Sequence, residues 1–162
     1  MIYTRKDLQN QLKGMSLRPT DSILIHSSMK AMGNIEGGAD TVLDALMEYF
    51  SQGLLLLPTH TWAQMGEEYR VFDPVQEDAC VGILPNLFRK RPGVCRSLHP
   101  THSVAAYGAG AEEYIAGEEE NNTPCTPGGC YDRLKDINGR ILLVGVTPVS
   151  YTHLRAHETR SN

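Results

Sequence analysis

Ser22-Ile23-Leu24-Ile25-His26 opens the stretch of sequence that decides the fold class, which runs on to Pro58. This compact apolar run is typical of a buried strand. Between Gly37 and Gln52 the apolar residues recur at the spacing of one helix face. Gly53 can end that helix, and the leucines from Leu54 to Leu57 then form a second buried strand. The order strand, helix, strand predicts a parallel pair of strands joined by a right-handed crossover.

Further elements are expected on both sides of this unit. A capping box at Thr4 and Asp7 predicts an amphipathic helix that ends near Gly14. The segment from Thr59 to Asp78 has little periodicity and is expected to be a long functional loop. Downstream, the pattern predicts helices over 81–91, 110–116 and 130–137 and strands over 103–107 and 140–146. The fold class is therefore α/β, with a mixed or mostly parallel sheet flanked by helices.

The composition indicates one globular domain. The chain has 162 residues, of which 41% are hydrophobic and 21% charged, and this is enough to bury a core. A net charge of −4 disfavours binding to nucleic acid. Acidic pairs recur in the expected loops and could attract a cationic small molecule, but solvated surface is the simpler interpretation of them.

No segment predicts a membrane span or a secretory signal. The longest strongly apolar run, Gly53 to Pro58, is far shorter than the roughly 20 residues that a spanning helix needs. The N-terminus is charged within its first residues and is not followed by an apolar stretch. The 4 cysteines lack the paired spacing of a zinc site. We therefore expect a cytoplasmic protein with reduced thiols, no bound metal and no membrane partner.

Polar residues gather where the expected strands end, which is where open α/β sheets bind their ligands. His26-Ser27-Ser28 follows the first strand, and Lys30 lies two residues further on. The hydroxyls and successive N–H groups of such a turn can hold a phosphate or a pyrophosphate. A serine-rich turn with a hydrogen-bonded histidine explains the same residues, and the spacing alone does not choose between the two.

Two further histidine-containing segments are candidates for chemistry. His60 and Trp62 follow the second strand, and the indole could either wall a substrate pocket or belong to the core. Thr101-His102-Ser103 leads into a later strand, and its imidazole and hydroxyls suit acid/base work or the orientation of a ligand. His99 precedes a proline that restricts its backbone, so we expect His99 to be structural and His102 to be functional.

Several stretches of the chain match one known family in order and in spacing. They are His26-Ser27-Ser28-Met29-Lys30, Glu36-Gly37-Gly38-Ala39, Leu57-Pro58-Thr59-His60-Thr61-Trp62, Phe72-Asp73-Pro74, Gly82-Ile83-Leu84-Pro85, Pro92-Gly93-Val94, the run from Arg96 to Ala106, and Ile141-Leu142-Leu143-Val144-Gly145-Val146. On these residues the sequence resembles the aminoglycoside N(3)-acetyltransferase family, an acetyl-CoA-dependent class that is distinct from the GNAT superfamily. The resemblance covers the chain from about Thr4 to Val146.

The resemblance implies that acetyl-CoA, as co-substrate, donates an acetyl group to an amine. The acceptor would be the 3-amino group of a 2-deoxystreptamine antibiotic or a related small cationic amine. The resemblance also implies that the His26-Ser27-Ser28 turn and the Thr101-His102-Ser103 segment face the coenzyme. From their places at the strand ends, we expect Lys30 to contact the coenzyme as well and His60 and Trp62 to contact the substrate. A non-catalytic CoA- or nucleotide-binding module and an inactive truncated fragment are the alternatives that remain open.

The C-terminal end departs from the family pattern. In the family the last matching strand is followed by a pattern like Ser-Asn-Thr-x-x-His-x-x-Glu, whose histidine the resemblance assigns as the catalytic base. Here Arg155 stands where that histidine is expected, and His153 and His157 flank it. The candidate catalytic residues are therefore His102, His153 and His157, with Glu158 as an orienting partner.

This departure also suggests a boundary. Residues 150–162 contain one large aliphatic side chain, Leu154, and have almost nothing to bury. We therefore expect residues 1–149 to be the N-terminal part of an acetyltransferase domain, and 150–162 to be an atypical, disordered tail of foreign sequence.

Overall fold

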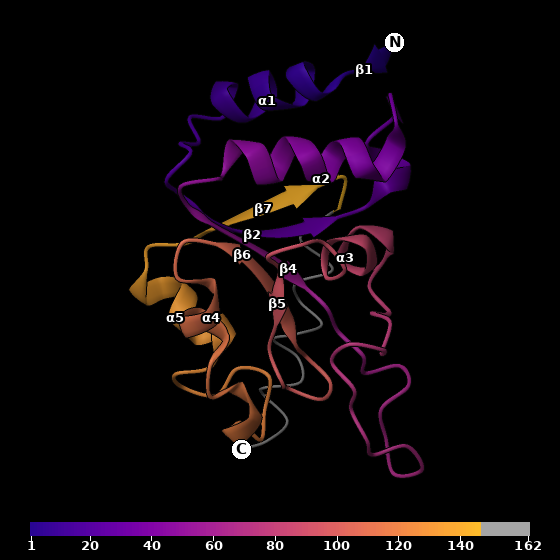
Figure 1. Ribbon diagram of the computed structural model, residues 1–162, viewed down its shortest axis with the longest axis vertical. Coiled ribbons are helices and arrows are strands. Elements are labelled where there is room, and N and C mark those ends of the chain that lie inside the picture. Colours follow the sequence, from indigo (N-terminus) through magenta and orange to yellow (C-terminus); the bar gives the residue numbers. More distant parts are fainter. Residues whose placement is uncertain (147–162) are drawn as a thin grey trace.

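A five-stranded sheet forms the middle layer of the protein, and the computed structural model describes residues 1–146 of the chain (Figure 1). The strands lie in the order β5-β6-β4-β2-β7. Their bounds are Cys95–Arg96 for β5, Val104–Gly108 for β6, Leu54–Pro58 for β4, Ser22–Ser27 for β2 and Arg140–Val144 for β7. The sheet is mixed, as the sequence predicts, because β2 runs parallel to both β4 and β7, whereas β6 runs antiparallel to β4 and β5.

One face of the sheet is covered by the first helices of the chain. They are α1 (Arg5–Gly14), α2 (Gly38–Tyr49) and α3 (Ile83–Phe88). In Figure 1, α2 lies against the sheet and α1 lies on its outer side. Ile23 and Ile25 of β2 join the core on this face, while Leu24 between them belongs to the core on the opposite face. Both faces of β2 are therefore buried, which explains why its sequence reads as an unbroken apolar run.

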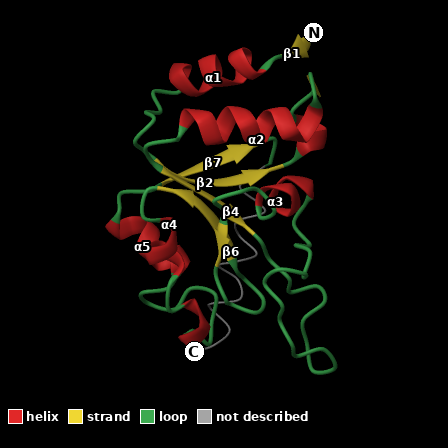
Figure 2. Ribbon diagram, viewed as in Figure 1, coloured by secondary structure: helices red, strands yellow, loops and turns green. Residues whose placement is uncertain are grey.

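The opposite face is covered by α4 (Ala111–Ile115) and α5 (Cys130–Asp136), with the short 3-10 helix η2 (Glu118–Glu120) between them in the chain. Figure 2 shows these helices on the far side of the strands from α1 and α2. Leu54 and Leu56 of β4 face this layer, and Leu55 and Leu57 face the other. The four leucines thus fill two separate cores through the alternation of side chains along a strand.

The structure confirms the predicted start of the first helix. Thr4 caps α1 by accepting a hydrogen bond from the Asp7 backbone N–H, and the Asp7 carboxylate accepts one in return from the Thr4 N–H. Arg5 then ties α1 to α2 through Asp44 and Glu48. The predicted helix between Gly37 and Gln52 is shorter at both ends, because Gly37 adopts a left-handed conformation as its N-cap and the helix ends at Tyr49 with Phe50 as its C-cap.

Two predictions of element length need correction. The helix expected over 81–91 is reduced to α3, because Gly82 has φ +116° and the N–H groups of residues 90 and 91 close tighter turns on Leu87 and Phe88. The last strand ends at Val144 rather than at 146, since Gly145 has φ +66°. In both places a glycine outside the ordinary helix or strand conformations sets the boundary.

Five short elements have no counterpart in the sequence-based prediction. They are β5, β1 (Ile2–Tyr3) and β3 (Asn34–Ile35), of which the last two pair in parallel, and the 3-10 helices η1 (Met29–Ala31) and η2. Elements of two or three residues are too short to show a periodicity, and β1 and β3 exist only because distant parts of the chain meet.

The segment between β4 and α3 contains no helix or strand among its residues, as predicted. Figure 2 shows it as an extended loop that projects away from the sheet. Over the described range 1–146, no helix combines the length and the apolar character that crossing a membrane requires.

Gly53 offers a test of the close packing at the start of β4. A Cβ at this position would lie 2.2 Å from the carbonyl oxygen of Asp21, which is backbone and cannot move aside. Gly53→Ala is therefore expected to lower the free energy of unfolding by about 1–3 kcal/mol. Gly14→Ala is the control, because a Cβ there meets nothing within 4 Å. Urea unfolding should show the loss for Gly53→Ala only, and equal stability of both variants would contradict the packing.

Candidate functional site

The candidate site lies at one edge of the sheet, where three strands bring polar residues together. The carboxyl ends of the parallel strands β2 and β4 meet at this edge. Because β6 runs antiparallel to β4, it presents its amino end here, and the register pairs Pro58 with Val104. The residues that follow Pro58 therefore face the residues that precede Val104, and the predicted segments at 59–62 and 99–103 come together.

The pairing of β4 with β6 continues beyond the residues counted as strand. The Thr59 N–H donates to the Ser103 carbonyl over 2.8 Å, and the Thr61 N–H donates to the Thr101 carbonyl over 2.9 Å. His60 and His102 lie directly opposite each other between these bonds. In an antiparallel ladder such a pair projects to the same face. Accordingly the two imidazole rings are 4.7 Å apart between centroids.

His60 is 5% exposed and is held from a second direction by helix α5. Its Nε2 atom lies 2.5 Å from the hydroxyl oxygen of Tyr131. The Cys80 N–H donates to the His60 carbonyl over 2.7 Å, so the end of the long loop returns onto this residue. His60 is therefore an interior residue of the site, and its assignment to the substrate stays a prediction.

His99 acts as a structural residue, as predicted. Its Nδ1 atom accepts hydrogen bonds from the backbone N–H groups of Thr101 (3.2 Å) and His102 (3.0 Å). This imidazole thus closes the turn that carries His102. The His102 ring is half-buried, and its Nδ1 atom is 2.9 Å from the Thr101 hydroxyl.

Burial favours the neutral form of His26, His60 and His99. Burial, together with smaller contributions from positive charge on the neighbouring histidines, lowers the pKa of His60 to about 3. Burial also lowers the pKa values of His26 and His99. A cluster of neutral imidazoles accepts hydrogen bonds and protons, which an imidazolium cannot do.

The turn after β2 presents hydroxyls to solvent. Ser27 and Ser28 are both half-buried, and within residues 1–146 neither hydroxyl has a hydrogen-bond partner. The Ser28 N–H, however, donates to the Val144 carbonyl of β7 over 2.9 Å. The predicted row of free backbone N–H groups is therefore interrupted at Ser28. The two serine hydroxyls are the donors by which this turn could bind a ligand. Lys30 is exposed beside them.

The Ser103 side chain is fully buried and engaged within the protein. Its hydroxyl donates to the Thr59 carbonyl and accepts from the Arg96 Nε–H, over 2.9 Å and 3.1 Å. Both hydrogen bonds are made within the protein, and the assignment of Ser103 to the coenzyme stays a prediction. The structure therefore places the Ser103 side chain in the support of the site, although its sequence neighbour His102 reaches the surface.

Trp62 is 53% exposed, so the interpretation that it belongs to the core is wrong. It begins a turn in which the Met65 N–H donates to the Thr61 carbonyl. The strands do not bring Trp62 to the same environment as His60, since one side chain is in solvent and the other is buried. Its assignment to the substrate stays a prediction.

The other catalytic candidates, His153, His157 and Glu158, lie outside the described residues, as does the expected tail over 150–162. Within 1–146, no group of three or more histidine, cysteine or acidic side chains is arranged to hold a metal ion.

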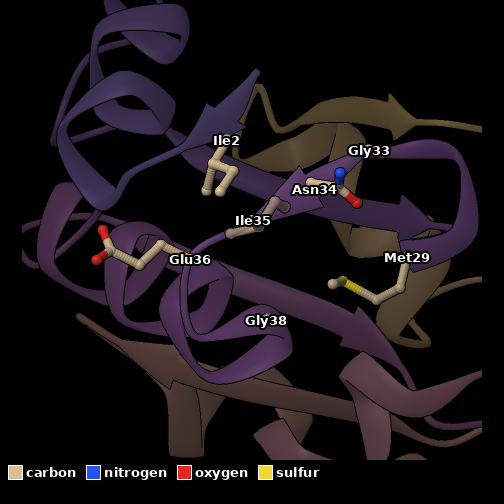
Figure 3. Close-up of a pocket in the computed structure, with 7 residues that line it drawn as sticks. All are labelled: Ile2, Met29, Gly33, Asn34, Ile35, Glu36 and Gly38. Atoms are coloured by element: carbon tan, nitrogen blue, oxygen red, sulfur yellow. The ribbon is translucent and has the colours of Figure 1, made fainter.

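A cavity of about 450 Å³ lies next to the site, beyond the end of β2 (Figure 3). It is bounded by Met29 of η1, by residues around β3 and by Gly38 at the start of α2. None of the predicted site residues lines it. Ile2 and Ile35 give it an apolar wall, and Glu36 lies at one side.

Sequence reasoning misses two residues of the site. In the sequence, Arg96 is only one member of a stretch that matches the family, and Tyr131 is only one residue of a predicted helix. Neither is recognisable as a site residue on its own. A polar residue that contacts a site from a distant element leaves no local pattern, so neither role can be found from spacing.

Comparison with known proteins identifies the family and the fold. The family model described as aminoglycoside 3-N-acetyltransferase matches residues 24–162. Aminoglycoside N(3)-acetyltransferase VII of Streptomyces paromomycinus is 32% identical over 173 residues, covering 96% of this chain and 60% of the relative. The chain belongs to the aminoglycoside 3-N-acetyltransferase family. The match includes residues 150–162, while the proposal that they are foreign sequence stays a prediction.

Solved structures of the same family share the fold. AAC-VIa bound to sisomicin superimposes with a TM-score of 0.80 at 26% identity, covering 91% of this chain and 61% of the other. A binary complex of AAC-IIIb with CoASH gives a TM-score of 0.75 at 25% identity, covering 88% and 59%. The chain thus spans about 60% of the length of the curated relatives it matches.

Stability should depend on pH through His60. An unfolded chain protonates this residue near its ordinary pKa of 6.5, whereas the folded chain does so at about 3. Between these values the unfolded state binds more protons, so stability falls as the pH falls. His60 alone contributes a slope of about 1.4 kcal/mol per pH unit between about pH 5 and 6.

His60→Asn should flatten this slope, and urea unfolding at several pH values measures it. Carboxylates with lowered pKa values, such as Asp21, add their own loss of stability only at lower pH, because their ordinary pKa is 3.8. Parallel pH profiles for the two proteins would show that His60 is not buried in its neutral form.

Proposed function

We propose that the protein binds acetyl-CoA and takes part in transfer of its acetyl group to an amine of an aminoglycoside, in particular the 3-amino group of 2-deoxystreptamine. The observation that carries this proposal is the meeting of the serine turn after β2 with the His60–His102 pair at one sheet edge, in a chain of this family. Because the chain spans about 60% of its curated relatives, further residues of the relatives contribute to their activity.

The serine turn is the proposed coenzyme contact. Ser27 and Ser28 offer hydroxyls without partners among residues 1–146, and exposed Lys30 adds a positive charge beside them. Hydroxyl and ammonium donors suit the diphosphate and amide groups of CoA. A solved relative binds CoASH, which supports the same ligand here.

The proposed chemistry is direct transfer. The nitrogen of a neutral amine attacks the thioester carbonyl carbon, the carbon–sulfur bond breaks, and the CoA sulfur leaves and takes up a proton. The amine nitrogen loses a proton to a base as the amide forms. His102, with its half-buried ring, is proposed to lie beside the reacting thioester or the pantetheine arm. His153 or His157 is the proposed base.

The acceptor is proposed to be a cationic amine. The chain carries a net charge of −4, and the exposed loop after Trp62 contains Glu67 and Glu68. A negative surface attracts a polycation and raises its rate of encounter. Solved relatives are bound to sisomicin, to a gentamicin and to apramycin. We place the reaction in the cytoplasm, where acetyl-CoA is available.

Removing either serine hydroxyl should weaken coenzyme binding. Ser27→Ala and Ser28→Ala are each expected to cost about 0.5–3 kcal/mol of CoA binding free energy, the range for a lost neutral or charge-assisted hydrogen bond. Ser51→Ala is the control, because Ser51 is exposed before the amino end of β4, at the opposite edge of the sheet. Calorimetry with CoA measures the three affinities. Unchanged affinity for both site variants would remove the turn from the coenzyme site.

His102→Ala should lower acetyl transfer while the protein stays folded. A group that positions or exchanges a proton at the reacting centre contributes roughly 100-fold or more to the rate. The measurement is thiol release from acetyl-CoA in the presence of a 2-deoxystreptamine antibiotic, together with the melting temperature. A large drop in melting temperature with an unaltered rate per folded molecule would make His102 a structural residue.

A further inference from the structure

Arg96 occupies the side of the β4–β6 ladder that the histidine pair does not use. Its Nε–H donates to the Thr59 hydroxyl over 3.2 Å and to the Ser103 hydroxyl over 3.1 Å. Its Nη2 group donates to the Thr59 carbonyl over 2.9 Å. A single guanidinium therefore holds both members of the residue pair that is adjacent, on each strand, to His60 and His102.

The same guanidinium also holds the long loop. Its Nη1 group donates to the carbonyls of Pro74 (3.0 Å) and Glu77 (2.6 Å). The cation lies over the Phe72 ring, 5.0 Å from the ring centroid. Arg96 thus joins the loop after β4 to the strand end from which that loop starts, and only a planar fork of donors can reach all of these acceptors.

The partners of Arg96 are carbonyl and hydroxyl oxygens. Within residues 1–146, no carboxylate oxygen lies within 4.0 Å of its side-chain nitrogens. Burial lowers the pKa of Arg96 to about 10, so the group is still charged at neutral pH. Arg96 is half-buried, and a charged group partly removed from water against neutral acceptors is costly unless its hydrogen bonds are made, which favours a defined geometry over simple charge pairing.

The consequence follows from the alternation of a ladder. Thr59 and Ser103 project to one face, and His60 and His102 project to the other. Locking the first pair fixes the backbone on both sides of the second. Rotation or slippage at this end of the ladder would separate the two imidazole rings, which are 4.7 Å apart.

We propose that Arg96 is a positioning residue that clamps Thr59, Ser103 and the loop over 72–77, and thereby holds His60 and His102 together at the candidate site. The clamp itself depends only on the described contacts. Its consequence for acetyl transfer rests on the proposed function.

Arg89 provides a matched control. It donates to the Val75 carbonyl and to the Asp78 carboxylate, and its side chain is 3% exposed. It therefore anchors the same loop from α3, but its hydrogen bonds do not include Thr59 or Ser103. Arg89→Met should loosen the loop without moving the histidine pair.

The experiment compares Arg96→Met, Arg96→Lys and Arg89→Met with the unaltered 162-residue chain. Hydrogen exchange is read at the Thr61 and Cys80 amides, which bond to the Thr101 and His60 carbonyls. Histidine side-chain NMR follows the titration of His60. Both Arg96 variants should speed exchange at Thr61 by about tenfold or more, because several hydrogen bonds are lost together.

The pKa of His60 distinguishes a positioning role of Arg96 from general support of the fold. In both Arg96 variants its pKa should rise by about one unit or more, because water reaches the ring. Arg89→Met should leave this pKa unchanged. A rise in Arg96→Met that Arg96→Lys fully reverses would show that charge alone acts, and this overturns the proposal. An equal response in Arg89→Met, or no response in any variant, also overturns it.

CoA affinity of the unaltered chain separates this proposal from the proposed function. If the chain fails to bind CoA while the Arg96 variants still shift His60, the proposed function fails and the clamp stands. If the chain binds CoA but neither Arg96 variant changes His60 or Thr61, the clamp fails alone. Should Arg96→Met not fold, Arg96→Lys and Arg89→Met carry the same comparison.

Discussion

The antiparallel register of β4 and β6 is the constraint on which the site depends. It pairs Pro58 with Val104 and continues through hydrogen bonds on both sides of His60 and His102. This continuation turns two polar segments that are distant in the sequence into one surface. The parallel pairing of β4 with β2 then adds the serine turn at the same edge. If β6 ran in the other direction, its polar leading segment would lie at the far end of the sheet.

The polar edge is supported by groups with different physical tasks. His99 closes the turn before β6 by accepting two backbone N–H groups, and Tyr131 reaches His60 from the opposite helical layer. Arg96 donates hydrogen bonds to uncharged oxygens at three places, which are Thr59 directly after β4, Ser103 directly before β6, and the long loop. Burial then lowers the pKa values of His26, His60 and His99, so the edge carries imidazoles as acceptors rather than as cations. This electrostatic state is compatible with the proposed reaction, in which an amine gives up a proton.

The long loop after β4 is held in place by hydrogen bonds although it lacks regular secondary structure. It has no helix or strand, yet its carbonyls are bound by Arg96 and Arg89, and its end returns to the His60 carbonyl. Its outer part carries Trp62 and acidic residues in solvent. The loop is thus anchored to the site through its backbone while these side chains lie in solvent.

The sequence by itself determined the elements that bury apolar side chains. The runs at 22–26 and 54–57 and the periodicity of α2 specify strands and a helix, because only those conformations bury such patterns on the correct faces. The stretches that match the family also identify it from sequence. The residue types after the first strand indicate the serine turn, and the proline after His99 indicates a structural role for that histidine. Only the tertiary structure decided that His60 is interior, that Trp62 is exposed, that the Ser28 N–H is used by β7 and that Ser103 faces Arg96. Each of these depends on a partner from a distant strand or loop, and a contact between distant segments leaves no periodic signal in either one.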